Sequence, residues 1–529
     1  MSRHPEKVLR DENSRTALTL SPAFATIAED GSVDYSNVTW KFPQYLATVF
    51  ATLGAMAAGT TLAWTSPALP LLKSNAMNGT GFAGLDLTVS EGSWVGSLLT
   101  LGACLAALPS GPISDRVGRK RFLSAISLPF LMSWLLVAVV PNVQALYCAR
   151  FLAGLATGAV SVVIPIYVGE ISEHTIRGTL GSFFQLMLTL GILFSYAVGA
   201  FTSSYGILAV ASSATAALFL LGALWMPETP QYLLAWGRRE EASRSLMWLR
   251  GVDNPIAIER ELSRMEHDLA ASAKEALDRG GSGAIGVVRE LVFSPVCRKA
   301  MIVTLGLMTF QQLSGVNAVI FYSESIFRSA VDGLSAGPST VIFGTVQVTV
   351  TAVAALLVER VGRRFLLCLS SLAASIALCS LAVFFHLQDN ALASGHSLKG
   401  LGWLPLVSLA AFMVAYSLGL GPLPWAMMGE LFPSSVKGTA SGIAVSTNWM
   451  LAFIVTKTFS SMKLAIGSDG AFWVFSAICA LSVMFVAFFV PETKGKSDHE
   501  IHNSLDGGFG GTRQWRTRRN EPIKLISAN

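Results

Sequence analysis

Amide side chains occur inside stretches of this sequence that are otherwise strongly apolar. Gln311, Gln312 and Asn317 fall within seven residues of one stretch, and other stretches hold Gln185, Gln347, Trp425 and Asn448. A buried amide is costly unless it is hydrogen-bonded. These amides therefore either bond to one another across helices or face a cavity. In a cavity, neutral donors and acceptors beside an aromatic ring suit an uncharged polar ligand.

The spacing of the three clustered amides limits how they could meet one ligand. In an ideal helix with about 100° per residue, Gln311 and Asn317 point about 120° apart. They can meet one ligand only if the helix is interrupted or the cavity wraps around it. Ser314 and Gly315 lie between them and favour an interruption.

The sequence shows no catalytic or nucleotide-binding motif that would favour a different function. The sequence lacks a Gly-x-x-x-x-Gly-Lys-Ser/Thr loop and a His-Glu-x-x-His pair, which argues against an ATP-driven pump and a zinc hydrolase. The six cysteines have neither paired nor metal-ligand spacing: Cys104, Cys148, Cys297, Cys368, Cys379 and Cys479. We therefore expect no enzyme activity, no cofactor, no metal and no nucleic-acid partner.

The elements that position these residues are predicted to be membrane helices. Of 529 residues, 52% are hydrophobic and 13% are charged, whereas a soluble domain has about 25% charged residues. About 20 apolar residues cross a bilayer as a helix. Twelve stretches qualify: 44–67, 92–112, 122–140, 144–168, 179–200, 205–226, 300–327, 339–358, 365–386, 402–431, 438–460 and 470–490.

Basic residues set the expected orientation. Arg and Lys concentrate in the loops after the second and eighth stretches and in residues 237–299, and such loops stay in the cytoplasm. Both termini should then be cytoplasmic, in a multi-pass protein of the plasma membrane. Asn78, in an Asn-Gly-Thr sequence of the first outward loop, becomes a candidate glycosylation site.

Charged motifs recur in the two halves of the chain. Residues 115–120 read Asp-Arg-Val-Gly-Arg-Lys and residues 359–364 read Glu-Arg-Val-Gly-Arg-Arg. Each half then has a Glu followed seven residues later by a basic residue, and later Pro-Glu-Thr. We expect a cytoplasmic network that changes with conformation, although the charges could simply fix topology. Its predicted members are Asp115, Arg116, Arg119, Arg150, Glu170, Arg177, Glu228, Glu359, Arg363, Arg364, Glu430, Lys437 and Glu492.

The repeat predicts an all-α membrane protein with two pseudo-symmetric six-helix halves. Residues 237–299 should form a cytoplasmic helical bundle between the halves, with a flexible Gly- and Ser-rich linker at 272–286. The predicted divisions are a cytoplasmic segment 1–43, halves 44–236 and 300–491, the linker 237–299 and a cytoplasmic tail 492–529.

These motifs resemble the sugar porters of the major facilitator superfamily. The resemblance covers about residues 40–500 and is carried by segments 115–120, 150–154, 170–178, 227–230, 311–317, 359–364, 421–425 and 491–495. Within that family the chain is most similar to insect facilitated trehalose and glucose transporters, through segments 65–69, 93–96, 425–430 and 455–459. Gln231 departs from the family pattern, which usually has Arg there.

The resemblance implies roles for the candidate residues. It implies that Gln185, Gln311, Gln312, Asn317, Gln347, Trp425 and Asn448 contact a sugar. It also implies that Phe321 and Tyr322 close an outward gate, although aromatic residues at that depth often only anchor the membrane interface. Gly421, Pro422 and Pro424 must interrupt a helix, as a static kink or as a hinge that moves Trp425.

The first apolar stretch bears on energy coupling. Between Gln44 and Pro67 the sequence has no Asp, Glu, Lys, Arg or His, whereas proton-coupled relatives place a carboxylate in this helix. We therefore expect downhill transport of trehalose or a hexose such as glucose by alternating access, with a monomer in the lipid bilayer as the transport unit. A proton-coupled symporter and a non-transporting sugar sensor on the same fold remain the alternatives.

Overall fold

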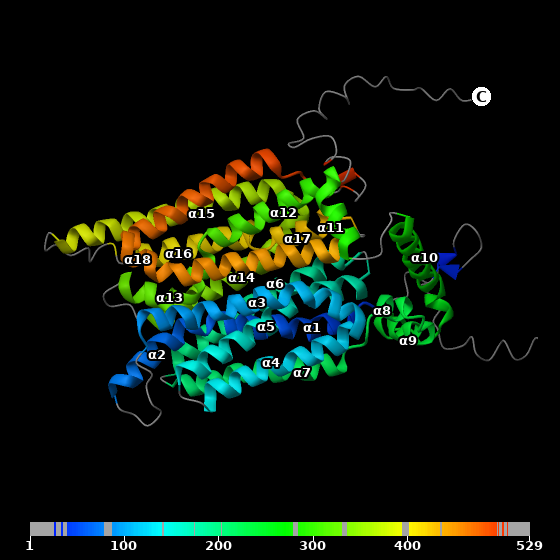
Figure 1. The fold of residues 1–529 in the computed structure, drawn as a ribbon, viewed down its shortest axis with the longest axis horizontal. Coiled ribbons are helices and arrows are strands. Elements are labelled where there is room, and N and C mark those ends of the chain that lie inside the picture. The colour runs from blue at the N-terminus through cyan, green and yellow to red at the C-terminus, as the bar shows by residue number, and fades with distance from the viewer. Residues whose placement is uncertain are drawn as a thin grey trace, which may run out of the picture.

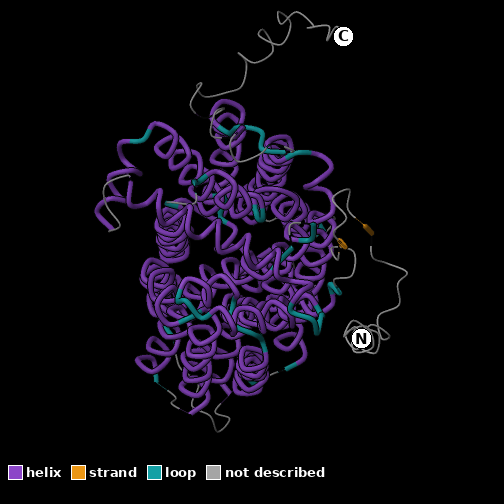
Figure 2. The backbone as a smooth tube through the Cα atoms, turned by 90° about the vertical axis from the view of Figure 1, so that its right-hand side faces the viewer, coloured by secondary structure: helices purple, strands orange, loops and turns teal. Residues whose placement is uncertain are grey.

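The fold is described from a computed structural model. It describes residues 26–27, 33–34, 40–78, 87–139, 142–173, 175–202, 204–278, 284–330, 336–393, 401, 403–433, 436–494, 496, 500–501 and 505. Long helices run side by side along the molecule, and Figure 2 views them nearly end-on. The end that contains Arg119 and Arg363 is called the signature end, and the opposite end is called the far end.

The first half of the chain forms one group of helices, in the lower part of Figure 1. Its helices are α1 (Phe42–Ala63), α2 (Thr65–Asn78), α3 (Val89–Val117), α4 (Arg119–Val139), α5 (Val143–Ile171), α6 (Arg177–Phe201) and α7 (Tyr205–Trp225). Close glycine contacts hold this group together. A Cβ on Gly154 would lie 2.2 Å from the carbonyl oxygen of Leu99, so α5 lies directly against α3 because this residue has no side chain.

The second half forms the upper group in Figure 1. Its helices are α12 (Pro295–Leu313), α13 (Val316–Ala330), α14 (Ala336–Val361), α15 (Arg363–Ala393), α16 (Leu404–Ala415), the π-helix η3 (Tyr416–Leu420), α17 (Leu423–Leu431) and α18 (Lys437–Phe489). Two of these helical runs are interrupted at glycines with positive φ: Gly315 (φ 83°) separates α12 from α13, and Gly467 (φ 80°) kinks α18.

The apolar helices agree with the expected membrane architecture. Within the described residues, ten helices are long and apolar enough to cross a membrane. If α18 is taken as two helices that meet at Gly467, and α12 with α13 as one interrupted helix, these helices correspond to the twelve predicted stretches. Most of the helices extend beyond the predicted stretches at one end or both, because polar caps and charged turns continue them past the apolar residues.

Helices also form the connection between the halves. These are α8 (Pro230–Ala235), α9 (Arg239–Arg250), α10 (Ile256–Asp278) and α11 (Ala284–Phe293). Helices α8 to α10 lie beside the signature end of the first half (Figure 1), and α11 packs on α12. The predicted flexible linker at 272–286 was wrong at both ends, because α10 continues to Asp278 and α11 begins at Ala284. Four alanines and a leucine at 270–277 favour helix over the serine between them.

A short antiparallel pair precedes the helices. Strand β1 (Thr26–Ile27) pairs with β2 (Val33–Asp34), so that Thr26 lies opposite Asp34.

Candidate functional site

Four of the predicted amides form one chain of hydrogen bonds. The Nδ2 of Asn317 donates to Oε1 of Gln312 (2.5 Å), and Nε2 of Gln312 donates to Oδ1 of Asn448 (2.7 Å). The Nδ2 of Asn448 in turn donates to Oε1 of Gln311 (2.8 Å). Finally, Nε2 of Gln311 donates to the carbonyl oxygens of Leu420 (2.9 Å) and Gly421 (2.7 Å). The chain joins α12, α13 and α18 to the break after η3.

The members of this chain differ in what they can offer a ligand. Gln311 is 1% exposed and Asn448 is fully buried, and both use their amide groups within the protein. Gln312 and Asn317 are 5% and 7% exposed, and each has an amide hydrogen without a described acceptor. The interruption at Gly315 turns Asn317 back toward Gln312. Gln312 and Asn317 are therefore the members best placed to meet a ligand.

The other three predicted ligand residues lie outside this chain. Gln347, on α14, is 1% exposed, and its Oε1 has no hydrogen-bond partner among the described residues. Gln185 is partly exposed on α6 of the first half, and Trp425 is partly buried on α17. An unpaired buried acceptor such as Oε1 of Gln347 is costly, which marks it as a group that a bound molecule could satisfy.

The interruption predicted at Gly421, Pro422 and Pro424 is present. The helix widens into η3, where the backbone N–H of Gly421 donates to the carbonyl oxygen of Tyr416 at 2.7 Å. The Oγ of Ser370 accepts from the N–H of Leu420 and donates to the carbonyl oxygen of Ala415. A side chain from α15 thus satisfies backbone groups that the break leaves free, as expected for a π-turn near a functional site.

At the far end the two halves are joined by hydrogen bonds. Ser66 Oγ lies 2.8 Å from Ser323 Oγ and accepts from the N–H of Glu324. The hydroxyl of Tyr196 donates to the carbonyl oxygen of Ile320 at 2.8 Å, and Nζ of Lys457 donates to Oγ of Ser93 at 2.8 Å. Nearer the middle of the helices, Ser446 Oγ donates to the carbonyl oxygen of Cys104 at 3.0 Å.

The two predicted gate residues lie at this far-end contact. Phe321 is fully buried on α13. The hydroxyl of Tyr322 donates to the carbonyl oxygen of Thr456 at 3.4 Å, and a Cβ on Gly96 would lie 3.1 Å from that hydroxyl. Tyr322 also lines a cavity of about 490 Å³ between the halves, together with Ser93, Ser325, Phe459 and Lys463. The ring of Tyr322 thus fills the space between α3, α13 and α18.

At the signature end the repeated motifs form matching structures in the two halves. Gly118 (φ 102°) and Gly362 (φ 107°) each make the turn into the next helix. Glu228 accepts from the backbone N–H groups of Arg119 (2.9 Å) and Lys120 (3.1 Å). Glu492 accepts likewise from Arg363 (3.0 Å) and Arg364 (3.1 Å). The Pro-Glu-Thr carboxylate therefore caps the first turn of α4 or α15, where a negative charge is favoured.

Ion pairs complete each of these structures. Arg119 pairs with Asp115 (2.7 Å) and Glu170 (2.9 Å), and Arg363 pairs with Glu430 (3.3 Å). Each of these pairs joins residues of the same half. Two other predicted members bond to the backbone: Arg364 donates to the carbonyl oxygen of Ala487, and the guanidinium of Arg177 lies 3.5 Å from the carbonyl oxygen of Ser172. Arg116 is exposed, and so is Lys437 at the start of α18.

Arg150 does not belong to the predicted cytoplasmic network. It lies near the far-end start of α5, 1% exposed, and donates to the carbonyl oxygens of Thr61 (2.7 Å) and Val95 (3.0 Å). Its guanidinium also lies over the ring of Trp64 at 5.5 Å. Because α5 runs from the far end to the signature end, a residue two turns into it cannot reach the signature loops.

Arg250 is a buried charge that the sequence analysis missed. This residue ends α9 with 1% exposure and pairs with Glu261 at 2.6 Å and Glu173 at 3.5 Å. It also donates to the carbonyl oxygen of Ile171 at 3.1 Å, and Gln44 of α1 donates to Glu173 at 3.1 Å. Arg250 thereby fixes the helical connection to the first half. Its sequence surroundings do not distinguish it from the exposed arginines nearby.

Two predicted residues cannot be placed in these networks. The side chains of Glu359 and Asn78 lie outside the described residues.

Comparison with known proteins identifies the family. The family described as "Sugar (and other) transporter" matches residues 54–505. The chain belongs to this family of membrane proteins. It is 36% identical over 504 residues to the facilitated trehalose transporter Tret1 of Anopheles gambiae, covering 94% of this chain and 61% of that protein. It is 36% identical over 495 residues to Tret1 of Polypedilum vanderplanki, covering 92% of this chain and 94% of that protein. The chain thus spans about three fifths of the mosquito relative.

Solved structures show the same fold. The xylose transporter XylE from E. coli, in a partially occluded inward open conformation, superposes with a TM-score of 0.70. It is 23% identical in sequence, and the match covers 86% of this chain and 99% of XylE. The fold is therefore that of the major facilitator superfamily, as the sequence predicted.

Proposed function

We propose that the protein transports a neutral sugar, trehalose or a hexose such as glucose, down its gradient by alternating access. The observation that carries this proposal is the amide chain, whose least buried members, Gln312 and Asn317, offer uncharged donors and acceptors beside an interrupted helix. A sugar presents many hydroxyls and no charge, so these groups match it. The trehalose transporters that resemble the chain support the same substrate class.

The first helix supports transport without proton coupling. Three of its four threonine hydroxyls bond locally or to a neighbouring helix: that of Thr61 donates to the carbonyl oxygen of Ala57, and that of Thr60 lies 3.2 Å from that of Thr215. The buried hydroxyl of Thr48 has no described partner. The nearby buried cation, Arg150, bonds to backbone carbonyl oxygens. A threonine hydroxyl does not ionise near neutral pH and this helix has no carboxylate, so it offers no group that could take up and release a coupling proton.

The proposed working unit is a monomer in the plasma membrane with both termini in the cytoplasm. The halves at 44–236 and 300–491 would rock about the amide chain. The basic loops favour a cytoplasmic signature end, and the hydrogen bonds at the far end then correspond to a state closed to the outside. Gln185, Gln347 and Trp425 would complete the sugar site as the halves move, and Asn78 would carry a glycan.

Transport by the purified protein tests this proposal. In proteoliposomes, radiolabelled trehalose or glucose should equilibrate across the membrane without accumulating, and a protonophore should leave the initial rate unchanged. Accumulation that collapses with the proton gradient would instead identify a symporter. Sugar binding without any flux would identify a sensor.

Replacing single amides separates a ligand role from a structural role. Gln312→Ala removes one neutral hydrogen bond to the sugar, worth about 0.5–1.5 kcal/mol, so sugar affinity should fall about 2–13-fold. It also removes the bonds of Gln312 to Asn317 and Asn448, and the effect of that loss on stability is measured separately. The matched variant, Gln311→Ala, leaves the carbonyl oxygens of Leu420 and Gly421 without a donor and should mainly lower the melting temperature. Binding by isothermal calorimetry and thermal unfolding in detergent measure the two effects. Equal loss of stability in both variants would favour a purely structural amide chain.

A further inference from the structure

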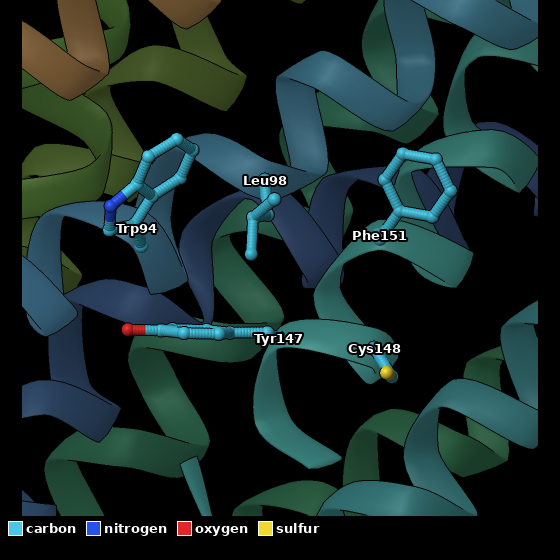
Figure 3. A pocket seen from close by; sticks show the side chains of 5 residues that line it. All are labelled: Trp94, Leu98, Tyr147, Cys148 and Phe151. Carbon is cyan, nitrogen blue, oxygen red and sulfur yellow. The ribbon is translucent and has the colours of Figure 1, made fainter. Parts of the chain in front are cut away.

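A groove on the outer surface of the first half has the character of a lipid site. Its volume is about 380 Å³, within the range of small-molecule sites, and Trp94, Leu98, Tyr147, Cys148 and Phe151 line it. Figure 3 shows the first two on one helix and the other three on its neighbour, with their side chains around a common space. The two helices are α3 and α5.

This groove opens toward the bilayer. Trp94 is 36% exposed, and the thiol-bearing Cys148 is exposed. Leu105, two helical turns beyond Leu98 on the same face of α3, is 55% exposed. Both helices are long and apolar enough to cross a membrane, so lipid rather than water would cover this strip. An occupant must therefore come from the membrane.

Polar groups occur at one side of the groove. In Figure 3 the indole nitrogen of Trp94 and the hydroxyl of Tyr147 lie toward the same side, and Cys148 and Phe151 lie toward the other. Beyond Trp94 the charges are mixed, since Nζ of Lys457 lies 4.1 Å from the centre of its ring and Glu91 lies one turn before it. The mixed charge favours a neutral head group over a phosphate, and the three aromatic rings favour a flat, rigid body.

The wall behind the groove is already fixed. Arg150 follows Tyr147 by three residues on α5, and its Nε donates to the carbonyl oxygen of Val95, the neighbour of Trp94, at 3.0 Å. Two turns further along α3, a Cβ on Gly102 would lie 2.4 Å from the carbonyl oxygen of Phe151. A ligand would meet a preformed surface and would order little of the protein on binding.

We propose that this groove binds a membrane sterol, with the sterol hydroxyl at Tyr147 and Trp94 and the ring system against Leu98 and Phe151. The site is coupled to the far-end contact. The ring of Trp94 packs at 6.2 Å from Phe453 and holds Lys457, both on α18 of the second half. If the halves rock as proposed above, a sterol that braces Trp94 against α18 favours the state with the far end closed.

Photolabelling tests the site without reference to transport. The full chain in phosphatidylcholine nanodiscs is irradiated with a photoreactive cholesterol analogue and mapped by mass spectrometry. We expect adducts on the segments around 94–98 and 147–151, and competition by unlabelled cholesterol. Leu98→Trp, which fills the groove, should abolish these adducts. Leu135→Trp, at a 55% exposed position on α4, should leave them unchanged. Adducts spread over the lipid-facing helices and insensitive to Leu98→Trp would overturn the proposal and leave annular lipid only.

Cys148 provides an independent measurement. It is the exposed thiol among six cysteines that are otherwise buried or partly buried, so an apolar maleimide should react with it first. Cholesterol should slow this reaction several-fold. In Tyr147→Phe, the cholesterol concentration that gives half of this protection should rise about 2–13-fold, as expected for one lost hydrogen bond. The Cys148→Ser variant should lose the fast maleimide reaction, which assigns that reaction to Cys148. Equal protection by phospholipid without sterol would overturn the assignment to a sterol. None of these measurements requires that the protein transport sugar.

Discussion

The two ends of the molecule are held together in different ways. At the signature end, the described ion pairs of Arg119 and Arg363 and the helix caps of Glu228 and Glu492 each join residues of one half. At the far end, the bonds of Ser66, Tyr196 and Lys457 cross from one half to the other. Among these described contacts, ion pairs and carboxylate caps stabilise each half as a body, and single hydrogen bonds, one of them from the charged Lys457, hold the two bodies in one relative position.

This division suits a protein that must change shape without unfolding. A neutral hydrogen bond contributes about 0.5–1.5 kcal/mol, and one to a charged group about 1.5–3 kcal/mol. The few bonds across the far end can thus be exchanged within an equilibrium of a few kcal/mol. The capped turns at Gly118 and Gly362 can persist throughout. The following predictions test this division, beginning with the largest effect.

A disulfide across the far end should stop transport. Ser66 and Ser323 have their Oγ atoms 2.8 Å apart, close to the geometry that a disulfide needs. The double variant Ser66→Cys with Ser323→Cys should lose sugar uptake on oxidation and regain it with a reductant. Uptake by proteoliposomes and gel mobility of proteolytic fragments measure activity and cross-linking.

A matched cross-link within one half controls for this result. The Oγ atoms of Ser380 on α15 and Ser408 on α16 lie 2.7 Å apart. Their double cysteine variant should keep its transport when oxidised. Full uptake by a completely cross-linked far end would show that these bonds do not separate during transport.

Removing either capping charge should destabilise its half to a similar degree. Glu228→Gln and Glu492→Gln keep an acceptor oxygen but lose the charge that faces two backbone N–H groups. Each should cost about 0.5–2 kcal/mol, seen as a similar fall in the melting temperature in detergent. Glu240→Gln, in an exposed pair with Arg244 at 3.8 Å, should change nothing. A large effect in one half alone would contradict the equivalence of the two caps.

Weakening the far end should have the smallest effect. Lys457 is partly exposed, so hydration offsets most of its charged bond to Ser93. Lys457→Met should therefore remove about 0.5–1 kcal/mol, mainly the cation over Trp94. The open fraction should rise about two- to five-fold. A cysteine at Ser325, in the far-end cavity, should then react that much faster with a hydrophilic thiol reagent. Lys457→Arg should retain most of the contact. An unchanged rate in Lys457→Met would place the control of opening elsewhere.

Some of this arrangement could be read from the sequence because it depends on local order. The recurrence of Gly-Arg and Pro-Glu-Thr predicts matching structures in the two halves, and Glu228 and Glu492 do cap matching turns. The position of Gly315 between Gln311 and Asn317 likewise predicted the interrupted helix.

Other features depend on partners that leave no local pattern. Arg150 bonds to backbone carbonyl oxygens, which every residue has, so its sequence neighbours could not place it. Arg250 is buried only because Glu173, 77 positions earlier, and Glu261 converge on it. Ser66 and Ser323 are 257 residues apart and resemble any other serine in an apolar helix.

The amide chain has a direction. From Asn317 to Gln311 each side chain donates to the next, and the last donates to the backbone beside η3. Aligned dipoles of this kind strengthen one another, so the series is polarised from one end to the other. A donor on a ligand that bonded to the carbonyl oxygen of Asn317 would make its amide group a better donor and so strengthen a series that ends on the carbonyl oxygens of Leu420 and Gly421. By reciprocity, bending the backbone at those two residues would alter how readily Asn317 accepts that bond.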